Sequence, residues 1–168
     1  MDEGVSVPLT FVKRTRIHAT AAKVFAFHER LDALQLLSPP WQNVTILQPP
    51  KSLAVGTRVV LRAAVGPFRQ TIVAEHVAYE AGKSFTDRMV SGPFAFWQHH
   101  HVVEPDGNDA AFLDDRVEYV LPLGVLGRVF GAAIARRELT RLFDFRHDVT
   151  RRECEAAANV ADLTQRDA

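Results

Sequence analysis

The sequence predicts an α+β fold in which a seven-stranded antiparallel sheet is followed by one long C-terminal helix. Strand-like runs separated by turn signals occupy most of the chain up to Leu121. From Gly124 to about Ala158 the pattern becomes helical, with many Ala, Leu, Arg and Glu residues and no proline. A chain of 168 residues with 47% hydrophobic content can bury about 70% of its unfolded surface. We therefore expect a single domain, residues 1–168, that folds without disulfides or metals.

Turns that contain proline or glycine separate the predicted elements. The first strand, Leu9 to His18, precedes two helices, Ala21 to Glu29 with Thr20 as its N-cap, and Leu31 to Leu37, which ends before Pro39. The later strands are Val44 to Leu47, Thr57 to Ala64, Phe68 to Tyr79, Ser84 to Val90, Gly92 to His101 and Phe112 to Leu121, with Pro49-Pro50, Gly66-Pro67 and Gly82 between them. The predicted order is therefore strand, two short helices, six strands and a long helix.

The segment Gly92 to His101, with the sequence GPFAFWQHHH, concentrates aromatic and ionisable groups. Side chains alternate between the two faces of a strand, so Trp97, His99 and His101 share one face. Residues of the neighbouring strands on the same face are Phe85, Asp87, Met89, Leu113, Asp115, Val117, Tyr119 and Leu121. A turn centred near Gly107 would pair His99 with Asp115, and a shifted register would select a different partner. We expect carboxylates and a phenol beside two imidazoles.

Composition excludes several functional classes. The formal net charge is zero, which argues against a nucleic-acid partner. Cys154 is the only cysteine, which fits a reducing compartment, and the N-terminal sequence MDEGVSVP lacks the hydrophobic core of a signal peptide. The longest apolar stretch, Tyr119 to Ala135, is interrupted by Pro122 and Arg128 and is too short for a comfortable membrane span. We expect a cytoplasmic protein without a membrane span.

A series of short motifs occurs in order along the chain. They consist of Phe85 and Asp87; Gly92, Pro93, Phe94, Trp97, His99 and His101; Asp115, Val117, Tyr119, Leu121, Pro122, Gly124, Leu126 and Gly127; and Leu139, Phe143, Phe145 and Arg146. With these motifs and this element order, nearly the whole chain resembles the START-like, or SRPBCC, superfamily with its Bet v 1-like helix-grip fold. More narrowly, it resembles a bacterial branch labelled cyclase-like or cell-division-inhibitor-like. The resemblance implies a curved sheet that grips the last helix around a cavity for lipids, sterols, polyketides, quinones or other apolar molecules.

The residues themselves also fit a ligand pocket, which is typically apolar with a few convergent polar groups. We expect the ligand-binding residues to be Phe85, Asp87, Met89, Trp97, His99, His101, Asp115, Val117 and Tyr119. The alternative for Phe85 and Met89 is an ordinary core position. The alternative for His99 and Asp115 is a buried hydrogen-bonded pair that fixes strand register. The predicted partner is a small apolar molecule that carries one or more hydrogen-bonding groups.

A second interpretation is an enzyme of the polyketide cyclase/dehydratase or hydrolase type. His99 would act as a general base oriented by Asp115, and Tyr119 would stabilise the developing oxyanion. No nucleophile elbow, phosphate loop or cofactor fingerprint is present, so we expect no cofactor. A metal is a weaker alternative: His99 and His101, with Asp87 and Asp115, could supply nitrogen and oxygen ligands, but the H-x-H spacing alone is not specific.

A third interpretation is a protein-interaction or lipid-chaperone module. Apolar residues of the last helix form two clusters on nearly opposite sides, namely Leu126, Val129, Phe130 and Ala133 on one side and Leu139, Leu142 and Phe143 on the other. The glycines from Gly124 to Gly131 favour a loop there, which would act as a mobile gate. The alternative is a continuous helix that contacts the sheet with one face and a partner with the other. Monomer and homodimer both stay open, and the isolated His18, His28, His76 and His147 are expected at the surface or at helix caps.

Overall fold

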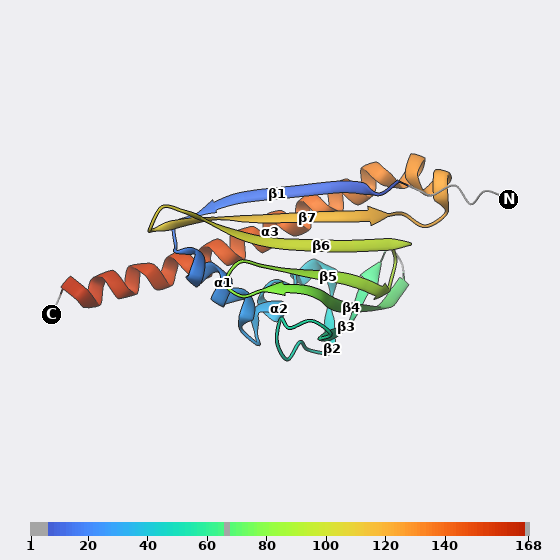
Figure 1. Ribbon diagram of the computed structural model, residues 1–168. Helices are drawn as coiled ribbons and strands as arrows, with labels where there is room; N and C mark the ends of the chain where they lie inside the picture. Colours follow the sequence, from blue (N-terminus) through green and yellow to red (C-terminus); the bar gives the residue numbers. More distant parts are fainter. Residues whose placement is uncertain (1–6, 66–67, 167–168) are drawn as a thin grey trace.

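The computed structural model describes residues 7–65 and 68–166 as a curved antiparallel sheet lying against one long helix (Figure 1). Its elements are β1 (Leu9–Ile17), α1 (Ala21–Glu29), α2 (Ala33–Leu36), η1 (Pro40–Gln42), β2 (Thr45–Gln48), β3 (Arg58–Val65), β4 (Phe68–Glu80), β5 (Ser84–Ser91), β6 (Phe96–Asp106), β7 (Ala110–Val120) and α3 (Gly124–Arg166). The predicted α+β class, strand number and element order are confirmed. The N-terminal MDEGVS segment and the Gly66-Pro67 turn considered above lie outside the described residues.

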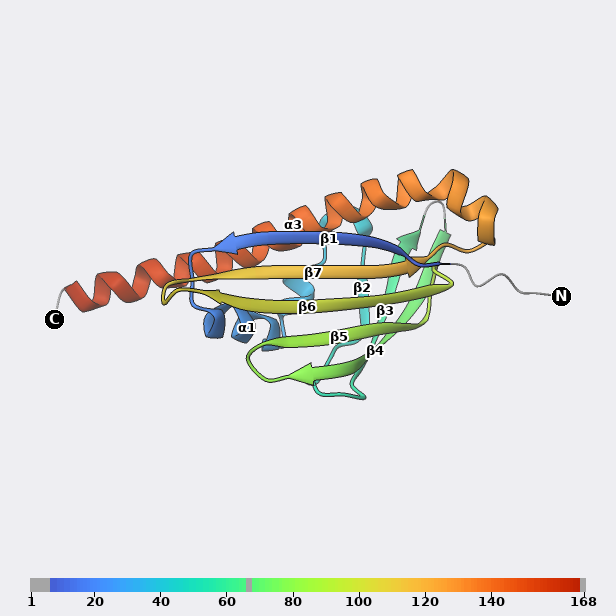
Figure 2. The ribbon, with the colours of Figure 1, turned by 45° about the horizontal axis from the view of Figure 1, so that its top comes forward.

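The sheet brings the first strand beside the last. Its order is β1-β7-β6-β5-β4-β3-β2, and every neighbouring pair is antiparallel. Helix α3 runs along the sheet and comes closest to β1, β7 and α1, whereas α1 packs against β6 and β7 near the end of their hairpin (Figure 2). The β2–β5 part of the sheet curves away from the seam between β1 and α3. Among the described residues, no helix combines the length and hydropathy needed to cross a membrane.

Two hydrophobic clusters hold these layers together. The first lies under α1 and includes Ile17, Val24, Phe25, Phe85, Val103 and Leu113; the second lies between β1, β7 and α3 and includes Phe11, Val117, Tyr119, Leu139 and Phe143. Leu139 is 4% exposed and Phe143 is fully buried, so this face of α3 is the one gripped by the sheet and not the seat of a second subunit. At the start of α1, the Thr20 hydroxyl accepts a hydrogen bond from the Lys23 backbone N–H, which confirms the predicted cap.

The predicted loop over Gly124 to Gly131 is wrong, because this segment is the first part of α3. The glycines have a packing reason. A Cβ on Gly127 would overlap the backbone carbonyl oxygen of Pro122, and a Cβ on Gly131 would lie 3.3 Å from Cδ1 of Leu121. The absence of a side chain at these positions therefore lets the first turns of α3 pack closely against the end of β7. The interpretation of this segment as a mobile gate is wrong.

The predicted register of the β6–β7 hairpin is also wrong, by two residues. The turn occupies Gly107 to Asp109, so His101 lies opposite Asp115 and His99 lies opposite Val117. Gly107, which has a φ of +74°, is the first residue of the turn and not its centre. A shift of two residues keeps every side chain on its predicted face, because strand side chains repeat every two residues.

Candidate functional site

A cluster of three histidines and two aspartates lies on the inner face of the sheet, where the two hydrophobic clusters meet. Strand β6 contributes His99 and His101, and β5 contributes Asp87, which pairs directly with His99. Strand β7 contributes Asp115. The fifth member, His147, comes from α3 and lies four residues after Phe143, on the helix stripe that faces the sheet. We call these five residues the histidine–aspartate cluster.

Asp115 is the centre of this cluster. Its Oδ1 lies 3.1 Å from Nε2 of His99, and its Oδ2 lies 2.8 Å from Nε2 of His147. Nδ1 of His147 lies 2.8 Å from the Thr15 hydroxyl on β1. Nδ1 of His101 is 2.8 Å from Oδ1 of Asp115, but its N–H is not aimed at that oxygen, so this contact is ionic and not a hydrogen bond. Asp115 thus ties β6, β7 and α3 together.

Asp87 closes the cluster on the opposite side of the two imidazoles. Its Oδ1 lies 3.5 Å from Nδ1 of His99 and 3.5 Å from Nε2 of His101. Exposure rises in this direction: the side chains of His99 and Asp115 are 2% and 4% exposed, that of His101 is 11% and that of Asp87 is 20%. The accessible end of the cluster is therefore formed by His101 and Asp87.

Aromatic rings fix the two imidazoles of β6. The Phe85 ring stacks on His101 with centroids 4.0 Å apart and an angle of 13° between the ring planes. The Phe143 ring meets the His99 ring edge-on at 5.0 Å. Arg146 is on α3, three residues after Phe143, and its Nε donates a hydrogen bond to the carbonyl of Leu37. The two ring contacts pack His99 and His101 against apolar side chains.

Burial and opposite charge act against each other in the cluster. Burial would lower the pKa of His101, but the Asp115 and Asp87 carboxylates raise that pKa to about 9. Burial would likewise raise the pKa values of Asp87 and Asp115, yet contacts with the histidines hold both pKa values well below the usual range. Burial lowers the pKa of Arg146, although both carboxylates favour its charged form. At neutral pH the accessible end thus presents a charged imidazolium beside a carboxylate.

The histidines that the sequence placed at the surface are mostly internal. His18 is exposed as expected, but His28, His76 and His147 are 8%, 5% and 2% exposed. His28 packs near His101 with ring centroids 6.0 Å apart, and burial is the main reason that its pKa falls to about 4. His147 is the functional residue that the sequence analysis missed. Its spacing of four residues from Phe143, itself four residues after Leu139, was the signal that placed it on the buried stripe.

The other predicted site residues lie on the expected face but at different distances from the cluster. Phe85 and Val117 are buried beside it. Trp97 lies opposite Tyr119 at the next inward-facing pair beyond His99 and Val117, and both rings contact Phe94. Met89 pairs with Ala74 on β4, further towards the open part of the sheet. The cluster and the aromatic pair are therefore adjacent, and Met89 belongs to a separate apolar surface.

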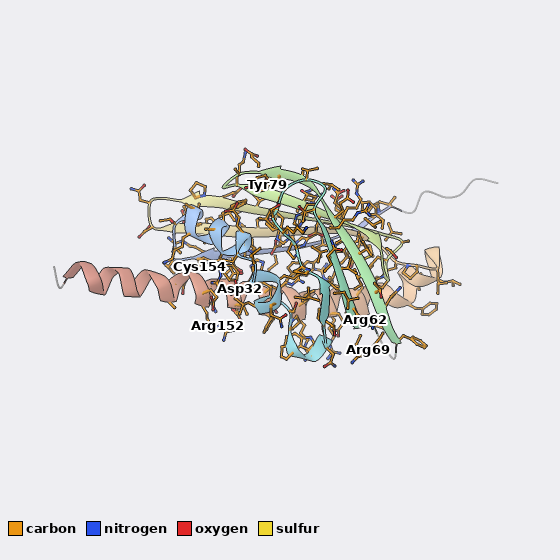
Figure 3. All side chains as sticks on the ribbon, turned by 90° about the horizontal axis from the view of Figure 1, so that it is seen from below. Asp32, Arg62, Arg69, Tyr79, Arg152 and Cys154 are labelled. Atoms are coloured by element: carbon orange, nitrogen blue, oxygen red, sulfur yellow. The ribbon has the colours of Figure 1, made fainter. Side chains whose placement is uncertain are left out.

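That apolar surface continues over the inner face of β3, β4 and β5. Most inward-facing apolar positions of β7 are buried, and so are Val59 and Ala63 on β3. Five other inward-facing apolar residues are half-buried, namely Leu61 on β3, Ile72 and Ala74 on β4, Met89 on β5 and Trp97 on β6. We call these five residues the apolar inner surface. Figure 3 shows this part of the molecule from below, with Arg62 and Arg69 marking the β3–β4 hairpin and Cys154 marking the opposite end near α1. Half-buried apolar side chains on the inner side of a curved sheet leave area for a ligand to cover.

A separate polar cavity lies on the other side of His147, at the seam between β1 and α3. It has a volume of about 300 Å³ and is lined by Lys13, Thr15, Asp144, His147, Asp148 and Arg151. Lys13 and Asp144 form an ion pair across it, and Asp148 pairs with Arg151. Its charged groups are thus already paired with one another, and it provides no apolar wall for a largely apolar ligand.

Comparison with solved structures agrees with this architecture. The chain is similar to truncated norcoclaurine synthase from Thalictrum flavum, with a TM-score of 0.67, 15% identity, and coverage of 90% of this chain and 96% of that chain. It is also similar to a START superfamily protein from Mycobacterium smegmatis, with a TM-score of 0.65, 11% identity, and coverage of 88% and 98%. A third similar structure is the di-domain aromatase/cyclase StfQ of the steffimycin biosynthetic pathway, with a TM-score of 0.66, 11% identity, and coverage of 92% and 53%. At these identities the similarity shows the fold alone.

No curated protein matches the chain significantly. A family model does match it over residues 8–155, which is most of its length, and that family is described as polyketide cyclase/dehydrase and lipid transport. Together with the helix-grip architecture, this confirms the START-like superfamily that the motifs indicated. The chain therefore belongs to the polyketide cyclase/dehydrase and lipid transport family.

Proposed function

We propose that this protein binds a small, largely apolar molecule of the lipid, polyketide, quinone or aromatic type between the sheet and α3. The observation that carries the proposal is the change in burial along the inner face of the sheet. Next to α3 the apolar residues Phe11, Val117 and Phe143 are buried, whereas the apolar inner surface is half-buried and extends towards the histidine–aspartate cluster. Apolar area that converges on a few polar groups is the usual character of a small-molecule site.

The polar end of the ligand would meet His101 and Asp87. These two side chains are the more exposed members of the cluster, and they offer a hydrogen-bond donor and an acceptor side by side. A ligand with a carbonyl or hydroxyl group at one end can pair with them while its apolar body covers the apolar inner surface. Trp97 is the member of the apolar inner surface whose ring lies beside His99, so it would contact the body of the ligand and give a fluorescence signal for binding.

Filling the apolar inner surface tests this proposal. Ala74 lies between Val59 and Met89 on the inner face, so Ala74→Trp should occupy the space that the ligand needs. Thr71→Trp, on the exposed outer face of the same strand, adds an equal side chain elsewhere. An apolar naphthalene sulfonate probe should bind to wild type and Thr71→Trp alike, and at least tenfold more weakly to Ala74→Trp. Equal binding by all three proteins, or binding by none, would refute the proposal.

A second candidate is cyclase/dehydratase-like catalysis at the same site, and one observation favours it. A charged His101 held between two carboxylates is placed as a general acid at the accessible end of the cluster. His99 is a poorer proton-transfer group than the sequence analysis supposed, since both of its nitrogens face carboxylates and its side chain is 2% exposed. Replacing His101 with Gln should abolish turnover of a polyketide-type substrate, a much larger loss than the accompanying loss of probe binding. Undiminished turnover would remove His101 from the mechanism.

A further inference from the structure

Three potential ligand atoms in the histidine–aspartate cluster point towards one another. They are Nδ1 of His99, Nε2 of His101 and an oxygen of Asp87, and all three lie within 4.8 Å of one another. Each nitrogen is 3.5 Å from Oδ1 of Asp87, at the limit of a hydrogen bond, and neither contact is a hydrogen bond. In a tetrahedral zinc site with bonds of about 2.0–2.1 Å, ligand atoms are about 3.3–3.4 Å apart. The two nitrogen-to-oxygen distances are close to that spacing, and the two nitrogens lie within 4.8 Å of each other.

The opposite nitrogens of both rings face a second carboxylate. Nε2 of His99 and Nδ1 of His101 lie 3.1 and 2.8 Å from the same oxygen of Asp115. In metal sites the second nitrogen of a ligating histidine commonly meets a carboxylate, which fixes the tautomer and leaves the first nitrogen free for the metal. Asp115 serves His99 in this way through a hydrogen bond, makes an ionic contact with Nδ1 of His101, and is itself held by His147. A metal ion bound to Nε2 of His101 would displace the proton from that nitrogen.

The surroundings also match a metal site that keeps an open position. The Phe85 ring fixes His101 from one side, so a metal ion would require little rearrangement of this ligand. Asp87 and His101 are the partly exposed members of the cluster, which provides both an entry path and a free coordination position.

We propose that Asp87, His99 and His101 bind one divalent transition-metal ion, with zinc the best fit to two imidazole nitrogens and one carboxylate at this spacing. Asp115 is then a positioning residue behind the two histidines and not a ligand. The inference goes beyond the proposed binding of an apolar molecule, and each can fail without the other.

Calorimetric titration of zinc into untagged, chelator-stripped protein tests the proposal. We expect one zinc ion per chain and an intense visible absorption band when cobalt(II) replaces zinc, as tetrahedral coordination produces. Asp87→Asn keeps the shape of the side chain but removes its charge, and should weaken zinc binding at least tenfold. His100→Gln is the matched control, because His100 lies between the two ligands in sequence but contacts Thr86 on the outer face; it should bind zinc like wild type.

Wild-type protein that binds no zinc saturably would overturn the proposal, as would equal losses in Asp87→Asn and His100→Gln. If Asp87→Asn fails to fold, His101→Gln provides the same comparison, and the cobalt spectrum of wild type is independent of any variant. Ala74→Trp separates this proposal from apolar-ligand binding, because it should lose the naphthalene sulfonate probe but retain zinc.

Discussion

At the scale of single residues, Asp115 shows which part of the site could be predicted from the sequence. Strand alternation placed it on one face with His99 and His101, and the structure agrees. Alternation could not show that His147 approaches from α3, because two apolar clusters on that helix left its buried face undetermined. Alternation also could not show that Asp115 lies diagonally from His99, because the residue opposite His99 depends on the length of the β6–β7 turn.

Removing the charge of Asp115 should destabilise the fold strongly. Asp115→Asn leaves the buried His147 without a carboxylate partner and leaves His99 and His101 with Asp87 alone, and breaking such a buried pair costs about 3–5 kcal/mol. The neighbouring Asp114 pairs with Arg14 on the outer face, so Asp114→Asn should cost about 0–1 kcal/mol. Urea unfolding of the two variants measures the difference. Similar losses for both would show that Asp115 does not hold the cluster together.

Stability should fall between pH 6.5 and 4 because of His28. Its pKa is about 4 when folded and 6.5 when unfolded, so in this window only the unfolded chain takes up the proton. The difference corresponds to about 3 kcal/mol that is fully present above pH 6.5 and lost as the pH falls towards 4. His28→Met should remove this contribution, measured as the free energy of unfolding against pH with a chelator present. Parallel curves for the two proteins would contradict it.

At the scale of elements, sequence periodicity predicted whether a segment is a helix or a strand better than it predicted which residues of other segments it contacts. Helix α1 was predicted at its observed bounds, and each strand to within a few residues at most ends. The predicted loop at the start of α3 is wrong because the low helix propensity of glycine was its only basis. Gly127 is needed there because its backbone lies against the carbonyl of Pro122. Such a contact between neighbouring elements has no periodic signal, so it becomes visible only in the folded chain.

Gly127 and Gly131 of α3 should therefore respond in opposite ways to alanine. Gly127→Ala forces a methyl group into the Pro122 carbonyl and should cost about 1–3 kcal/mol, despite the higher helix propensity of alanine. Gly131→Ala meets only the flexible end of Leu121 and should be neutral or stabilising by up to about 1 kcal/mol. Thermal unfolding of both variants provides the comparison. Equal behaviour would mean that helix propensity alone determines stability there.

At the scale of the whole molecule, the proposed binding depends on the curvature of the sheet, because α3 lies mainly against β1 and β7 and does not cover the far half of the sheet. Residue patterns predicted which side chains face inward, but not which of these stay half-buried, because that depends on where the long helix lies. The same architecture in proteins only 11–15% identical to this chain shows that many sequences satisfy it. The ligand is therefore specified by the inner-face side chains and not by the fold.

Native mass spectrometry of the protein isolated from its own cells tests most directly whether the inner face holds a small apolar molecule. We predict that wild type and Thr71→Trp carry the same additional small mass, which is released by organic solvent, and that Ala74→Trp lacks it. Wild-type protein found only at the mass of the bare chain, or an equal added mass in Ala74→Trp, would contradict the proposed site.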